Sequence, residues 1–267
     1  MTTAAGLRCV DGVVLCTATE MSAGYSKFSR SKFGVYDKLN CRPAFIYTGD
    51  RDFSFMAMQQ IAKDIARAIP ENIDIVEAIQ NKASEIYQRY FHLSTENRIL
   101  ELQAIVAVHL NQKENRLFLI RGPTVSPIDH AECIGMGSSL GTYVLQTMLS
   151  RTATVWEAAH VAAYLLFLTK THGACRGRES QIMIFTNQGG SRIFPDGPLQ
   201  SVSINEMEVD FSALQFGLGK VLTNLVNFKL ENNEYGDILK GFAEQMEALR
   251  TKQARQIQDY IQMEIER

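Results

Sequence analysis

The sequence predicts an α+β fold in which two helical layers cover the outside of a layered β-sandwich. Blocks of β-compatible apolar runs alternate with segments whose apolar residues recur at the three-to-four-residue spacing of helices. The resulting order is strands, two helices, strands, two helices, strands. The 267 residues are 46% hydrophobic and 21% charged, enough for one sizeable domain with an extension.

Local signals place the individual elements. Asp11-Gly12 is a hairpin turn signal between two apolar runs, and Pro70 ends the first helical stripe. Polar turns at 111–115 and 187–190 divide two later hairpins. The expected strands are 3–9, 13–19, 32–39, 43–48, 101–110, 116–121, 131–135, 181–186 and 191–194, and the expected helices are 52–69, 75–90, 138–150 and 153–170.

The last part of the chain differs from this body. After Pro195 and Pro198 the sequence becomes acidic and then helical, and it ends in a long charged segment with an apolar stripe. We therefore expect two domains, 1–200 and a helical extension at 201–267. The stripe fits either a helix packed on its own domain or a contact with a partner or second subunit.

Charge and cysteine usage disfavour several classes of function. The net charge of −2 provides no positive electrostatic potential that would attract nucleic acid or an anionic membrane surface. Five widely spaced cysteines read as reduced thiols, and neither they nor the five histidines show metal-site spacing. Gly135, Gly137 and Gly141 do not form a dinucleotide fingerprint. We expect a cytoplasmic protein without metal, cofactor or targeting segment.

The opening segment MTTAAGLRCVDGVVLCTATEMSAG resembles the start of a mature proteasome β-subunit and of its simpler bacterial relative, a proteasome-related peptidase. Both begin with Thr-Thr, run as a strand to a turn, and re-enter a strand of the Gly-Val-Val-Leu kind. Lys32, a strand that ends at Gly49, and the glycine-containing turn 133–138 extend the resemblance. It covers roughly residues 2–195.

The resemblance implies a four-layer αββα sandwich of the N-terminal nucleophile hydrolase type. It also implies self-assembly into a homo-oligomeric ring that encloses a chamber, a peptide or polypeptide substrate, and an ATPase unfoldase as a possible partner. The implied activity is hydrolysis of peptide bonds by an N-terminal threonine.

The candidate nucleophile is Thr2, exposed by removal of Met1. Its own α-amine would act as the general base, directly or through a water. Lys32 is the candidate cation that would keep this amine unprotonated, since a nearby positive charge lowers the pKa of an amine. The backbone N–H of Gly49 is the candidate oxyanion donor.

Three further residues are expected to contact the substrate. Ser22 and Ala23 would line the groove in which an extended peptide pairs with main chain, and Tyr47 would face the specificity pocket. The alternatives are that Thr2 is only the first strand residue, Lys32 a solvated lysine, Tyr47 a core residue and Gly49 a strand terminator.

Several supporting residues of the family pattern are missing. The acid that normally pairs with the lysine falls on Ala18, a supporting serine falls on Met136, and a second acid and serine fall near Gly173 and Arg176. Glu20 would replace the first acid only if the strand were shifted. Two alternatives to a threonine peptidase therefore stay open: a catalytically inactive ring scaffold or binding subunit, and an amidohydrolase that acts on a small amide.

Overall fold

The computed structural model describes residues 3–23, 26–29, 31–36, 43–71, 73–90, 101–110, 114–172, 180–187, 191–194, 204–225 and 232–265. The chain divides into two compact units, Met1–Phe194 and Pro195–Arg267. The boundary expected at residue 200 lies in the segment 195–203, outside the described residues.

The first unit alternates strands and helix pairs in the predicted order. Its strands are β1 (Thr3–Arg8), β2 (Gly12–Ala18), β3 (Glu20–Ala23), β4 (Ser26–Ser29), β5 (Phe33–Val35), β6 (Ala44–Gly49), β7 (Leu102–Leu110), β8 (Glu114–Arg121), β9 (Thr124–Pro127), β10 (Ala131–Gly135), β11 (Ser180–Thr186) and β12 (Ser191–Phe194). Its helices are α1 (Arg51–Ala68), α2 (Ile75–Tyr90), α3 (Ser138–Met148) and α4 (Val155–His172).

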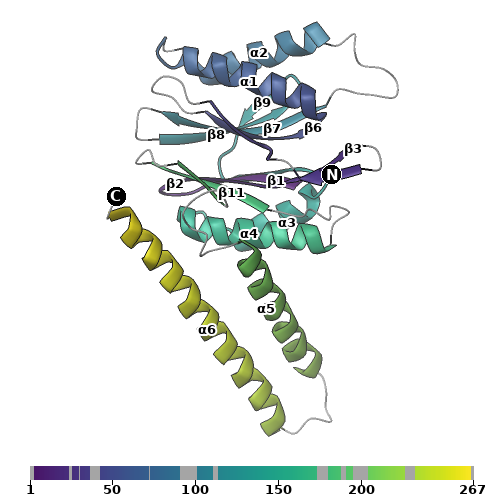
Figure 1. Ribbon diagram of the computed structural model, residues 1–267, viewed down its shortest axis with the longest axis vertical. Coiled ribbons are helices and arrows are strands. Elements are labelled where there is room, and N and C mark those ends of the chain that lie inside the picture. Colours follow the sequence, from purple (N-terminus) through teal and green to yellow (C-terminus); the bar gives the residue numbers. More distant parts are fainter. Residues whose placement is uncertain are drawn as a thin grey trace. The chain divides into compact units, whose positions relative to one another are not determined.

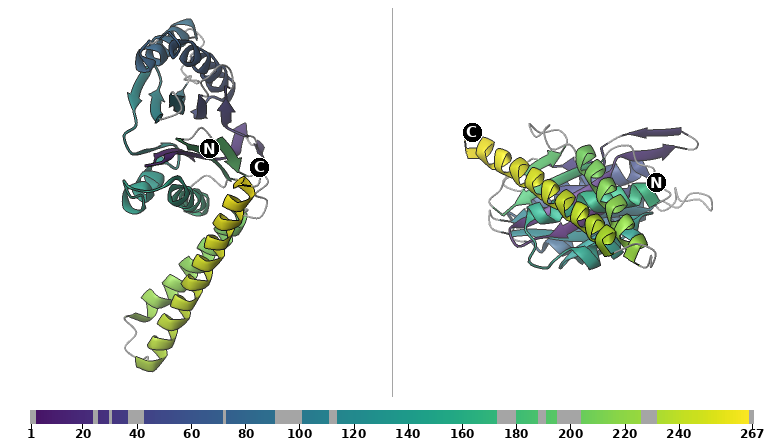
Figure 2. Two further views of the ribbon diagram at one scale, coloured as in Figure 1. Left: turned by 90° about the vertical axis from the view of Figure 1, so that its left-hand side faces the viewer. Right: turned by 90° about the horizontal axis from the view of Figure 1, so that it is seen from below.

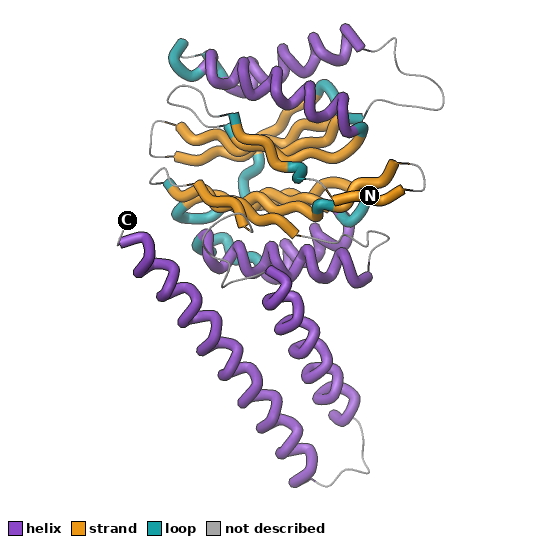
Figure 3. Tube along the Cα trace, viewed as in Figure 1, coloured by secondary structure: helices purple, strands orange, loops and turns teal. Residues whose placement is uncertain are grey.

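These elements form four layers, which confirms the predicted α+β sandwich (Figures 1 and 3). One five-stranded sheet has the order β10-β1-β2-β11-β12, and the other has the order β5-β6-β7-β8-β9. Helices α3 and α4 cover the first sheet, and α1 and α2 cover the second. Every described strand pair is antiparallel. Successive side chains of a strand point to opposite faces, so strands of the two five-stranded sheets alternate between a face toward the other sheet and a face toward helices.

The space between the two sheets holds the central apolar core. Ala4 of β1 and Leu15 of β2 meet Ile46 and Ile105 of the opposite sheet there. Even-numbered residues of β1 and odd-numbered residues of β2 therefore face between the sheets. A second core lies between the β5–β9 sheet and helices α1 and α2.

Two parts of the first unit were not predicted. β3 and β4 pair as a separate two-stranded ribbon, and β9 pairs with β8 where only a connecting loop was expected. The strand expected at 32–39 is short, with β5 spanning Phe33–Val35 and residues 37–42 outside the described part. The remaining strands and helices lie within a few residues of their expected positions.

The second unit contains two helices, α5 (Ile204–Leu225) and α6 (Asn232–Ile265), which pack along each other (Figure 2). Lys252 Nζ lies 2.9 Å from Asp210 Oδ2. A Cβ atom added to Gly217 would lie 2.8 Å from Phe242 Cδ2, so the helices approach closely at this glycine. Across the described residues, no helix is long and apolar enough to cross a membrane.

Candidate functional site

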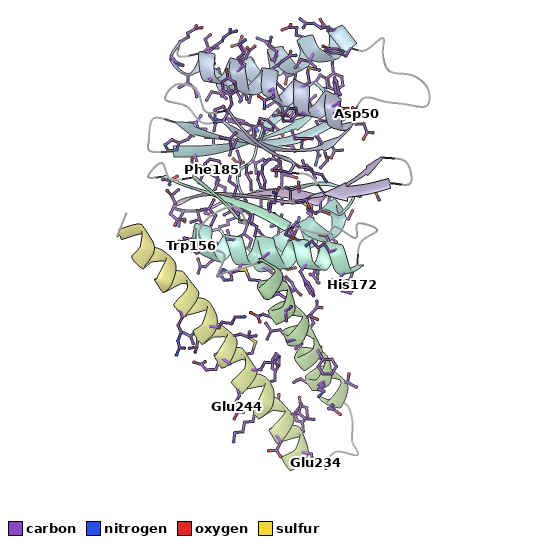
Figure 4. The ribbon with its side chains drawn as sticks, viewed as in Figure 1. Asp50, Trp156, His172, Phe185, Glu234 and Glu244 are labelled. Atoms are coloured by element: carbon purple, nitrogen blue, oxygen red, sulfur yellow. The ribbon has the colours of Figure 1, made fainter. Side chains whose placement is uncertain are left out.

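Two of the predicted site residues, Lys32 and Gly49, lie at one end of the sandwich, which we call the site end. There β1 begins, β6 ends at Gly49 and β7 begins beside it, because Gly49 pairs with Leu102. In the other sheet, Thr3 pairs with Gly135 at the end of β10. The Gly135 N–H donates to Gln103 Oε1 over 3.4 Å, which joins the two sheets at this end. Figure 4 labels Asp50 at the site end and Phe185 toward the opposite one.

Thr2 lies outside the described residues, and Thr3 is the first residue that the structure describes. Thr3 is fully buried on the face of β1 toward α3 and α4. A Cβ atom added to Gly137, which precedes α3, would lie 2.0 Å from Thr3 Oγ1. This hydroxyl has no hydrogen-bond partner in the described structure, so Thr3 anchors the first strand by packing.

Lys32 is fully buried immediately before β5. Among the described residues it is the one charged side chain in the buried set. Burying a cation costs free energy unless hydrogen bonds or opposite charges compensate it, and Lys32 is not without a partner. The interpretation of Lys32 as a solvated lysine is therefore wrong.

Gly49 ends β6 with a φ of +107°, a backbone conformation that residues with a side chain rarely adopt. A Cβ atom at this position would lie 2.1 Å from Glu101 O. The turn needs glycine for these reasons alone, so the strand-terminator interpretation holds. The role of Gly49 as an oxyanion donor stays a prediction. Asp50 follows it and caps α1 by accepting from Phe53 N over 3.1 Å.

Ser22 and Ala23 lie in β3, where they pair with Lys27 and Ser26 of β4. The β3–β4 ribbon contains two strands, so no other described strand pairs with the second edge of β3. An open strand edge can accept an extended peptide by main-chain hydrogen bonds. The substrate-groove role of both residues remains a prediction.

Tyr47 lies in the core between its sheet and the α1–α2 layer, where it is 4% exposed. Its ring centroid is 6.4 Å from that of Phe45 and 6.3 Å from that of Phe55. These contacts favour the core interpretation of Tyr47, and its role in a specificity pocket stays a prediction.

Sequence reasoning missed several polar side chains that lie between the sheets at the site end. Thr17 Oγ1 donates to Thr3 O over 3.3 Å. Gln181 pairs with Thr17 on the neighbouring strand, and its buried Oε1 has no described partner. In the other sheet, Gln103 of β7 pairs with Thr48 of β6. The signal was available, because these residues interrupt otherwise apolar alternation at strand ends.

The residues at the family's supporting positions do not replace the missing groups. Ala18 is 1% exposed and, by alternation along β2, faces the α3–α4 layer rather than the opposite sheet. Met136 is 56% exposed. Glu20 lies in β3 opposite Ser29. Gly173 and Arg176 fall outside the described residues.

The described cysteines do not provide an alternative nucleophile. Burial raises the pKa of both Cys9 and Cys133 to about 12, and it also raises the pKa of Cys16. All three are therefore protonated near neutral pH, whereas a thiol reacts as its thiolate. The described residues contain no group of three or more potential metal ligands from His, Cys, Asp and Glu.

Comparison with known proteins gives matches in structure alone. No family model and no curated protein sequence matches the chain. Three similar structures are Anbu from Pseudomonas aeruginosa in a helical assembly (14% identity, 83% of this chain and 96% of that one, TM-score 0.68), a Gly-1 mutant of Anbu from Hyphomicrobium sp. strain MC1 (14%, 83% and 99%, 0.66) and Anbu, described as an ancestral β-subunit, from Yersinia bercovieri (15%, 85% and 100%, 0.64). The likeness establishes the fold of this chain, a four-layer sandwich of the N-terminal nucleophile hydrolase type, as in proteasome β-subunits.

Proposed function

We propose that this chain is a threonine-type peptidase subunit of a proteasome-like oligomer, with Thr2 as the nucleophile once Met1 is removed. Even-numbered residues of β1 face the space between the sheets, so an extended residue 2 would face it as well. The Thr2 hydroxyl would then attack the carbonyl of a peptide bond, and its proton would pass to the α-amine.

The observation that carries this proposal is the burial of Lys32 at the site end. A buried lysine is costly to maintain and is found where its charge has a use. A free α-amine has an ordinary pKa of about 8, and a neighbouring ammonium group would lower that value. More of the amine would then be unprotonated at neutral pH and available as the base.

Self-assembly is part of the same proposal. One of the similar structures is a helical assembly, which supports an oligomer built from chains of this fold. A homo-oligomeric ring that faces its sites inward, a polypeptide substrate and an ATPase partner remain proposals for this chain.

The proposal is tested by intact-mass analysis and by labelling with a peptide epoxyketone, which captures both the hydroxyl and the amine of an N-terminal threonine. We expect a chain without Met1 that gains one inhibitor mass. Thr2→Ala should abolish labelling, whereas Thr3→Val, which removes the neighbouring buried hydroxyl, should preserve it. Retained Met1, or a processed chain that never labels, would contradict the proposal.

Lys32→Met provides a second readout. Methionine is apolar and of similar length, so the variant removes the buried charge without leaving a large cavity. We expect the pH at which labelling reaches half its maximum to rise, because the α-amine loses the neighbouring cation that lowers its pKa. An unchanged pH profile would exclude this role of Lys32.

A catalytically inactive ring scaffold is the second candidate, and two observations favour it. Ala18 supplies no acid and faces the helical layer, and Met136 replaces a supporting serine. A scaffold would form the same oligomer by size-exclusion chromatography but would not label under any pH condition.

A further inference from the structure

Gln103 lies at the beginning of β7, and its side chain reaches from one sheet to the other. On its own sheet it pairs with Thr48, the residue before Gly49. From the opposite sheet, the Gly135 N–H donates to Gln103 Oε1, and Gly135 is the register partner of Thr3. Gln103 thus connects the strand that carries the candidate oxyanion donor to the strands that position the start of β1.

This hydrogen bond favours one orientation of the side-chain amide. The Gly135 N–H needs an acceptor, so it selects the oxygen of the amide and leaves Nε2 with two N–H donors on the other side. Gln103 Nε2 donates to no described residue. The side-chain amide of Gln103 therefore presents two N–H donors at the site end, beside Thr48.

We propose that Gln103 is a catalytic residue whose Nε2 acts as a second oxyanion donor, together with the Gly49 N–H. The inference rests on the proposed function. As the Thr2 Oγ–carbon bond forms, the hydroxyl proton passes to the α-amine and the carbonyl π pair moves onto the oxygen. Both N–H groups donate to that oxyanion. On collapse, the carbon–nitrogen bond breaks and the leaving amine takes the proton.

An amide donor suits this position chemically. Side-chain amides are established oxyanion donors, and a donor that is already oriented needs no reorganisation during the reaction. Gln103 is neutral, so it adds no second charge at the site end. The arrangement fits a neutral carbonyl that becomes negative during attack, as in a peptide amide.

The test is Gln103→Glu, which keeps an oxygen acceptor for the Gly135 N–H and removes the N–H donors. At pH 8 we expect the second-order rate constant for epoxyketone labelling to fall about 100- to 1000-fold. At lower pH the new carboxyl group of this variant becomes protonated and gains an O–H donor, so its labelling rate relative to wild type should rise.

Gln80→Glu is the matched control, because it makes the same chemical change at another glutamine whose amide is hydrogen-bonded to backbone. Gln80 Nε2 donates to Pro123 O, and Val125 N donates to Gln80 Oε1. This variant should label at the wild-type rate.

Gln103→Met keeps the proposal testable if the carboxylate prevents folding. It should lose labelling to a similar extent but show no recovery at lower pH relative to wild type, with its fold checked by thermal melting. A folded Gln103→Glu or Gln103→Met protein that labels as fast as wild type overturns the role of Gln103 alone. A wild-type chain that has lost Met1 and never labels overturns both this inference and the proposed function.

Discussion

At the scale of single residues, the start of β1 is tightly packed, because Thr3 lies directly against Gly137. Thr3 is fully buried, and Gly137 lies so close that an added methyl group would overlap the Thr3 hydroxyl. Thr169 Cγ2 would lie 3.2 Å from the same added Cβ atom. The packing of Thr3, the residue next to the candidate nucleophile, therefore requires a glycine immediately before α3.

We expect Gly137→Ala to lower the free energy of unfolding by about 1–3 kcal/mol, because overpacking forces side chains and backbone to move. Adding Thr3→Ala should restore much of this loss, since it removes the overlapping hydroxyl. Gly219→Ala is the control: its Cβ meets nothing within 4 Å in α5, and a helical alanine is favoured over glycine by about 0.8–1.0 kcal/mol. Urea denaturation measures all three, and an unchanged stability of Gly137→Ala would contradict the expectation.

The family resemblance and the positions beside predicted strands selected Lys32 and Gly49 as candidates, whereas nothing in the sequence selected Gln103, whose role is a proposal. The lysine stands before a short strand and the glycine stands between a strand and a helix, so both are visible in a window of a few residues. The proposal for Gln103 depends on its hydrogen bond with the N–H of Gly135, 32 residues later in the chain. Contacts of that separation depend on how two sheets stack, which no local pattern specifies.

At the scale of elements, helix ends were easier to predict than short strands. The stripe before Pro70 and the hairpin around Asp11-Gly12 gave clear periodicity and turn signals. The β3–β4 ribbon has four-residue strands of mixed polarity, and β9 includes Pro127, which removes a backbone donor. Such short edge pairings are decided by neighbouring strands rather than by their own residues.

The N-terminal end of α2 offers an element-scale test. Asp74 Oδ1 accepts from Val76 N over 2.7 Å and from Glu77 N over 3.1 Å, so it satisfies backbone donors that the helix leaves unpaired. We expect Asp74→Ala to reduce the free energy of unfolding by about 1 kcal/mol, while Asp74→Asn should lose much less. Equal losses in both variants, measured by urea denaturation, would show that the cap is not the cause.

At the scale of the whole molecule, buried thiols link stability to alkaline pH. The pKa values of Cys9 and Cys133 are raised by burial from 9.0 to about 12, and that of Cys16 is raised as well. An unfolded chain would release these protons near pH 9, whereas the folded chain retains them. The contribution to stability is complete below about pH 9 and is lost as the pH rises toward about 12.

We therefore expect the urea concentration at the midpoint of unfolding to decrease as the pH is raised from about 8 to about 10.5. The decrease should exceed the one caused by titration of the other side chains. Cys133→Ala should show a smaller fall than wild type, because it removes one of the thiols that the folded state keeps protonated. Gly219→Ala changes no titratable group, and its added Cβ meets nothing within 4 Å, so it is the control for general handling. If Cys133→Ala and wild type lose stability equally over this range, Cys133 does not contribute to the linkage.

The central position of β1 and β2 has a consequence during synthesis. β2 leaves the ribosome well before β11, yet its Thr17 pairs with Gln181 of β11. At ordinary synthesis rates of about 5–20 residues per second, β2 waits on the order of ten to thirty seconds for that partner. During this interval an apolar strand has an open edge, which is a hazard for aggregation. Production of this protein should therefore benefit from slower growth or added chaperones, since one strand of the nascent chain is completed by another that is made much later.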